Sequence, residues 1–164
     1  MKRLALVAVA ILGFAVTGCG GSSSTSPSSN DITVFTVQLS ALNEVPPITN
    51  AEASARGTAV ITINKAANTI DFNVSLNGFT PTSAVNVAHI HGPNAPAGQT
   101  AGVLISTTLT AGTVQLTNGA GTFSFPGVTT SAANIANILA APQNFYFNVH
   151  TTLNGGGAIR GQLQ

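Results

Sequence analysis

The sequence predicts an all-β protein, an antiparallel sandwich of Greek-key type with about eight strands and one short helix. Three observations support this fold class. Apolar and polar residues alternate along most of the chain, turn residues separate the alternating segments, and a single segment has helical spacing. The alternation is clearest at 70–76, where Ile70, Phe72, Val74 and Leu76 share one face of an extended chain.

The expected strands run from residue 32 to the end of the chain. Segment 57–63 alternates like 70–76, and the six residues between them predict a hairpin with a loop longer than two residues. Gly-rich and Asn-rich turns separate the remaining segments. Further strands are expected at 34–41, 84–91, 102–109, 121–126, 144–151 and 158–163.

Segment 131–140 departs from the period of two. Ile135, Ile138 and Leu139 recur at helical spacing, and Ser131 precedes them as a residue suited to the N-cap position. We therefore expect a short helix that crosses one end of the sheets.

The N-terminal part predicts secretion and membrane anchoring. Residues 1–18 combine two positive charges with an apolar run too short to span a bilayer, which is typical of a signal peptide. The run ends in small residues before Cys19, the one cysteine of the chain, as in bacterial lipoproteins. We expect residues 19–31 to form a lipidated cysteine with a flexible Gly/Ser-rich tether, and 32–164 to form the folded domain. The expected location is the bacterial cell envelope, facing the periplasm or the exterior.

The composition excludes some partners. Charged residues make up 5% of the chain, against about 25% in typical soluble proteins. Two of the five Lys and Arg residues lie in the predicted signal peptide, so three cations and four acids remain. A domain with so few cations cannot neutralise a phosphate backbone, and we expect no nucleic-acid binding.

The three histidines of the chain are the candidate metal ligands. His89 and His91 share a face of one predicted strand, about 6–7 Å apart. Segments 89–104 and 148–163 align without gaps, which matches His91 with His150 and suggests two equivalent strand–His–loop units. Two interpretations stay open. The imidazoles either hydrogen-bond loop carbonyls at strand ends, or they form a three-His copper or zinc site.

Two charged residues predict a structural ion pair. Glu44 and Arg160 are rare charges in an almost uncharged chain, and we expect a carboxylate, that of Glu44 or of Asp71, to accept from Arg160. The chain has no nucleophile elbow, no phosphate-binding loop and no pair of acids at a spacing that suggests convergence. We therefore expect no enzymatic activity and name no catalytic residue.

Several motifs together resemble the CHRD domain, the module named after chordin. One position departs from the family pattern, because Ala158 stands where an acidic residue usually precedes "IRG". The resemblance implies an immunoglobulin-like β-sandwich in a secreted or surface protein. The matching motifs, in order, are "ALNEVPP" (41–47), "ARGTAVITI" (55–63), "AHIHGP" (88–93) with Gly98 and Gly102, "NVHT" (148–151) and "IRGQL" (159–163).

These observations lead to one functional prediction and one alternative. We expect a non-catalytic lipoprotein of the envelope whose domain acts as a binding or structural adhesion module, with an envelope or extracellular protein as its ligand. No cofactor is expected in that case. The alternative is a copper- or zinc-binding envelope protein that uses His89, His91 and His150.

Overall fold

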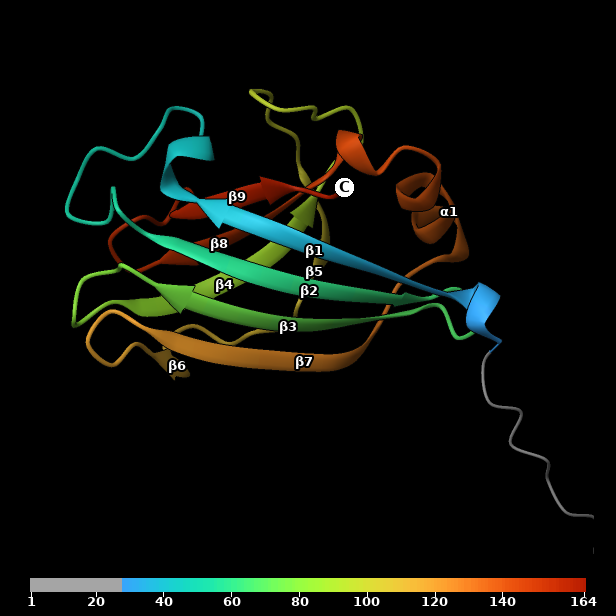
Figure 1. Cartoon of the computed structure of the whole chain (residues 1–164), viewed down its shortest axis with the longest axis horizontal. Helices are drawn as coiled ribbons and strands as arrows, with labels where there is room; N and C mark the ends of the chain where they lie inside the picture. The colour runs from blue at the N-terminus through green and yellow to red at the C-terminus, as the bar shows by residue number, and fades with distance from the viewer. Residues whose placement is uncertain (1–27) are drawn as a thin grey trace, which may run out of the picture.

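The computed structural model describes residues 28–164, which form one antiparallel sheet of nine strands and one α-helix (Figure 1). The strand order is β5-β4-β8-β9-β1-β2-β3-β7, and β6 pairs with β4 beside this path. The strands are β1 (Ile32–Ser40), β2 (Arg56–Asn64), β3 (Thr69–Asn77), β4 (Ala84–His91), β5 (Val103–Ser106), β6 (Val114–Gln115), β7 (Gly121–Thr129), β8 (Tyr146–Thr151) and β9 (Ile159–Gln162). The helices are α1 (Ala132–Ala140) and three short 3-10 helices, η1 (Ser29–Asp31), η2 (Ala41–Asn43) and η3 (Pro142–Asn144).

The sheet curls into a half-barrel, and its core lies between two halves. We call them the β2 half (β1, β2, β3, β7) and the β8 half (β4, β5, β8, β9). They meet where Ser40 of β1 pairs with Arg160 of β9. Across the core, the Phe72 and Phe147 rings stack with centroids 5.5 Å apart. The two halves thus bury one shared apolar layer, which stabilises them together.

Most local predictions are confirmed. The expected hairpin forms between β2 and β3, with Asn64 opposite Thr69. Helix α1 begins after Ser131, whose side chain accepts a hydrogen bond from the Asn134 amide at 3.1 Å. The prediction did not include β6, because a two-residue strand has too little alternation to be recognised.

An irregularity in β4 decides which way the histidines face. Val85 pairs with Thr151 and Val87 with His150, so Asn86 is an extra residue that interrupts the ladder. Strict alternation would place Val85 on the same face as His89 and His91. Because of the bulge, Val85 instead lies in the core, on the side of Ala88 and Ile90, and the histidines project from the outer face of the β8 half.

The predicted signal peptide 1–18 and the lipidation site Cys19 lie outside the described residues. Most of the predicted tether 19–31 also lies outside, and its last residues include η1. Within residues 28–164, no helix has the length and apolar character needed to cross a bilayer.

Candidate metal centre

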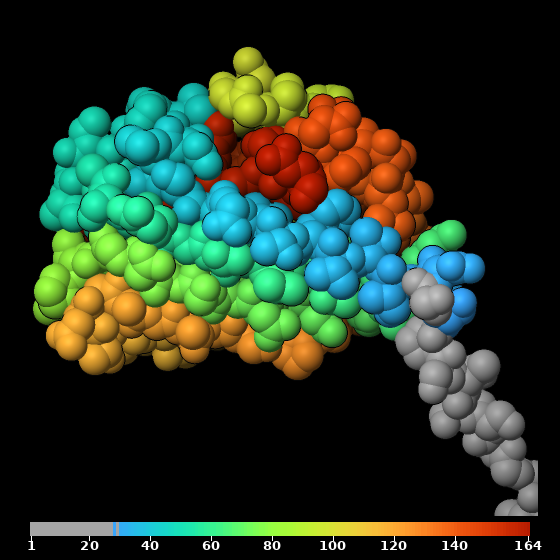
Figure 2. Space-filling view, in the orientation of Figure 1, coloured from blue at the N-terminus to red at the C-terminus, as the bar shows by residue number. Residues whose placement is uncertain are grey.

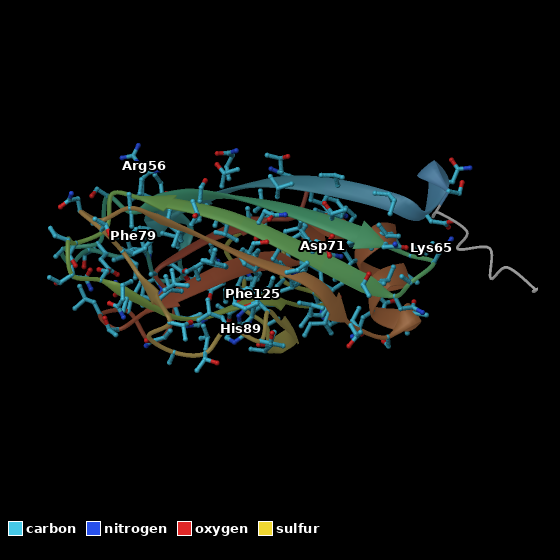
Figure 3. All side chains as sticks on the ribbon, turned by 90° about the horizontal axis from the view of Figure 1, so that it is seen from below. Arg56, Lys65, Asp71, Phe79, His89 and Phe125 are labelled. Carbon is cyan, nitrogen blue, oxygen red and sulfur yellow. The ribbon has the colours of Figure 1, made fainter. Side chains whose placement is uncertain are left out.

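The structure brings the three histidines together on the outer face of the β8 half. His89 and His91 come from β4, and His150 comes from the neighbouring strand β8. One ring nitrogen of each lies within 4.8 Å of those of the other two. Figure 3 shows His89 on the opposite side of the molecule from Arg56, which belongs to the β2 half.

Two of the rings are held by the loops that follow them. His91 Nδ1 lies 3.0 Å from the Ala101 carbonyl oxygen, and His150 Nδ1 lies 2.9 Å from that of Gly155. A carbonyl oxygen can only accept, so each Nδ1 carries the proton and donates it. In a neutral ring, Nε2 then holds the free lone pair, as in most metal-ligating histidines. The predicted hydrogen bonds from strand-end histidines to loop carbonyls are therefore confirmed.

One nitrogen of each ring is left without a partner. These atoms are His89 Nδ1, His91 Nε2 and His150 Nε2, and all three are buried. A buried polar atom without a hydrogen bond destabilises the fold by about 1–3 kcal/mol. His91 and His150 therefore make structural hydrogen bonds and still offer lone pairs, and the two interpretations of the sequence are compatible.

Burial keeps the three imidazoles neutral. Burial, together with the positive charges that His150 and His91 would carry, lowers the pKa of His89 to about 4. Burial also lowers the pKa of His91 and of His150, although hydrogen bonds to loop carbonyls act in the opposite direction. Neutral imidazole is the form that binds a metal ion.

A stack of side chains supports one edge of the cluster. The Tyr146 ring is parallel to that of His91, with centroids 4.7 Å apart and planes 3° apart. The guanidinium carbon of Arg160 lies 4.5 Å from the centroid of the Tyr146 ring. This cation–π contact fixes the tyrosine, and the tyrosine in turn fixes the His91 ring.

Asn148 connects the histidine cluster to a buried acid. It lies opposite His89 in the β4–β8 ladder, and its Nδ2 donates to Glu44 Oε1 at 2.8 Å. Asn148 Oδ1 is buried and has no hydrogen-bond partner. Burial raises the pKa of Glu44 to about 7, although the positive charge of Arg160 and the hydrogen bond from Asn148 both lower it.

Glu44 and Arg160, the predicted ion pair, are both buried, with 7% and 2% of their surfaces exposed. The expected bond from Arg160 to a carboxylate is not formed within the described residues, since the hydrogen bonds of Arg160 go to the carbonyl oxygens of Asn43 at 2.6 Å and Gln99 at 3.0 Å. Arg160 thus ties the loops on either side of β9 to the sheet, and it acts on Glu44 through its charge.

Glu52, for which the sequence predicted no role, is fully buried. Its carboxylate accepts hydrogen bonds from Ser83, from Thr151 Oγ1 at 2.7 Å and from Asn154 Nδ2 at 2.6 Å. These bonds hold the start of the loop that supplies the Gly155 carbonyl to His150. No local motif could reveal this role, because all of its partners are distant in the sequence.

A hollow lies over β9. Figure 2 shows β9 recessed between the segment that follows β1 and the loop that precedes β5. The hollow has a volume of about 630 Å³, and Glu44 and Arg160 contribute to its lining. Nearby, Leu42 and Leu153 are 70% and 51% exposed.

The comparisons with known proteins identify a family. The family model for the CHRD domain matches residues 35–163, most of the chain. Neither the search of curated proteins nor the search of solved structures found a significant match.

Proposed function

The chain belongs to the CHRD domain family, and we propose that it is a binding module for one copper or zinc ion. The single observation that supports this function is the convergence of the three imidazoles, one ring nitrogen of each lying within 4.8 Å of those of the other two. His89, His91 and His150 would hold the ion. The module is proposed to be non-catalytic.

The geometry suits a small metal ion. Zinc–imidazole bonds are about 2.0–2.1 Å long, so the nitrogens of a tetrahedral site lie about 3.3 Å apart. The three donors lie within 4.8 Å of one another and would approach to that spacing on binding the ion. Three protein ligands leave one position for water or another ligand. Imidazole suits both zinc and copper, and no described residue adds a thiolate that would select between them.

Metal binding is expected to raise thermal stability. When free zinc exceeds Kd by 100-fold, binding adds about 2.7 kcal/mol, which raises Tm by roughly 10 °C in a domain of this size. The experiment compares Tm of the metal-stripped protein with and without Zn²⁺ or Cu²⁺, and again after EDTA. Because Cys19 could also bind metal, the chain carries Cys19→Ser.

Ligand variants show whether the histidines are responsible. Removing one of three ligands should lower affinity by more than about 100-fold, because second-shell changes alone cost about 10–100-fold. We therefore expect His89→Ala to abolish the Tm rise, whereas Asn73→Ala, an exposed change on the β2 half, preserves it. An equal rise in wild type and His89→Ala would remove the proposal.

We also propose that the protein is anchored at the bacterial envelope by a lipid. A lipid on Cys19 would hold the domain at the bacterial envelope, facing the periplasm or the exterior, with 19–31 as its tether. The low charge of the chain, 5% of its residues, supports a module that does not bind nucleic acid. Growth with a labelled fatty acid, which should label wild type and leave Cys19→Ser unlabelled, tests the anchor.

A second candidate function is adhesion to an envelope or extracellular protein. Leu42, which lines the hollow, and Leu153, which lines a depression next to it, are exposed and support this function, because apolar contact residues are typical of binding loops. Leu42→Ser combined with Leu153→Ser should abolish recovery of a partner by the immobilised domain. Recovery unaffected by this double change would argue against that surface.

We also propose that the curled sheet is an immunoglobulin-like sandwich of Greek-key type. The two halves of the sheet are joined by the single register pair Ser40–Arg160, and they pack through Phe72 and Phe147. Such packing is the arrangement that two facing layers of a sandwich would have. A crystal structure of the domain would test this assignment.

A further inference from the structure

We propose that Glu44 and Asn148 form an outer layer of the metal site that makes it prefer divalent over monovalent ions. This inference rests on the metal-binding function proposed above. It concerns the buried residues behind the three histidine ligands.

The charges around the cluster call for a negative counter-charge. Three neutral imidazoles add no negative charge, and the guanidinium of Arg160, which stacks on Tyr146 beside His91, adds a positive one. A divalent ion placed there would bring a local charge of three into a buried region, which is strongly unfavourable without a counter-charge. The Glu44 carboxylate is buried and hydrogen-bonded to the strand that carries His150, so it can supply that counter-charge.

The other acids are placed differently. The chain has four acidic residues. The carboxylate of Glu52 is occupied by donors from Ser83, Thr151 and Asn154. Asp71 belongs to the β2 half and accepts from the Gly127 amide at 2.7 Å, and Asp31 lies in η1. Glu44 is therefore the acid best placed to act on the cluster.

Asn148 is held in one orientation beside the cluster. Its Nδ2 is fixed by Glu44, and its Oδ1 is buried without a donor, on the same face of β8 as His150 and opposite His89. A buried amide oxygen without a partner is unfavourable by about 1–3 kcal/mol. A water molecule bound at the open position of the ion would provide a donor for this oxygen. Glu44 thus orients Asn148, and Asn148 presents a partial negative charge to the ion.

Coulomb energy is proportional to the charge of the ion. Loss of the Glu44 charge should therefore reduce the binding free energy of a divalent ion by twice as much as that of a monovalent ion. Loss of a second-shell partner usually lowers affinity by about 10–100-fold. For Glu44→Gln we therefore expect about 10–100-fold weaker Zn²⁺ binding and about 3–10-fold weaker Ag⁺ binding. Glu44→Asp, which keeps the charge, should restore most of the Zn²⁺ preference.

The test is competitive titration of Zn²⁺ and Ag⁺, in chloride-free buffer, against the full chain with Cys19→Ser. The variants are Glu44→Gln, Glu44→Asp and, as a charge-matched control on the far half, Asp71→Asn. Asn148→Ala should show the same selective loss as Glu44→Gln, and it remains informative should Glu44→Gln fail to fold.

The outcomes separate the two proposals. If the parent chain binds neither ion, the metal-binding function itself is wrong. If it binds both and neither Glu44→Gln nor Asn148→Ala lowers Zn²⁺ affinity more than Ag⁺ affinity, the outer layer is wrong and the three-His site stands. A selective loss of Zn²⁺ in both variants but not in Asp71→Asn supports the outer layer.

Discussion

Replacing Glu44 with Gln tests the electrostatics of the site in the metal-free protein, because the change removes the charge and keeps the size. Burial raises the pKa of Glu44 from 4.5 to about 7. Between these values the folded protein holds a proton that the unfolded chain has released, so the free energy of unfolding falls as pH rises. One pKa unit corresponds to 1.36 kcal/mol, so the full effect is about 3 kcal/mol above pH 7. Between pH 5 and pH 8 the expected loss is about 2–3 kcal/mol.

Urea denaturation of metal-free wild type and Glu44→Gln at pH 5 and pH 8 measures this effect. The wild type should lose about 2–3 kcal/mol relative to the variant over that range. The shared histidines cancel in the comparison, and Asp71→Asn controls for the removal of one negative charge. A stability difference between wild type and Glu44→Gln that is the same at both pH values would refute the assigned burial of a charge at Glu44.

Three further predictions concern the surroundings of the cluster. Gly157→Ala should destabilise the protein by more than about 1 kcal/mol and weaken Zn²⁺ binding, because φ is +136° and a Cβ would lie 2.6 Å from Asn148 Nδ2. Urea denaturation and zinc titration check this, with Gly156→Ala as control, since a Cβ there meets nothing within 4 Å. Ser131→Ala should cost about 1 kcal/mol through loss of the cap on α1, with unchanged zinc affinity. In metal-free protein the three histidines should contribute less to stability as pH falls below about 6.5, because burial lowers their pKa values and the unfolded chain binds protons first. The stability of the wild type relative to a variant with all three histidines changed to Gln should therefore fall over that range, since Glu44 is present in both proteins.

Alternation and turn residues predicted most of the fold, because both depend on local geometry. The hairpin 57–76 and the capped helix after Ser131 need only neighbouring residues to be recognised. The joining of the two halves through Ser40 and Arg160 could not be predicted, because it depends on pairing between strands at opposite ends of the chain. The bulge at Asn86 has no marker in the sequence, so the face of the histidines was also beyond prediction.

The ligands of the candidate site were predicted from the sequence, whereas the residues around them were not. His89, His91 and His150 were found because histidine is rare in this chain and two share a strand face. Tyr146 and Asn148 precede His150 at the same alternation, so the period of two could have identified them. The hydrogen bond between Glu44 and Asn148 could not be predicted from the sequence, because the two residues lie 104 positions apart.

X-ray absorption spectroscopy of the zinc-loaded protein tests the central claim most directly. A site made by His89, His91 and His150 predicts a first shell with three imidazole nitrogens at about 2.0–2.1 Å and the multiple-scattering features of the rings. His150→Ala should remove one ring from this shell. A first shell of oxygen atoms without imidazole features, or a spectrum that does not change in His150→Ala, would contradict the account.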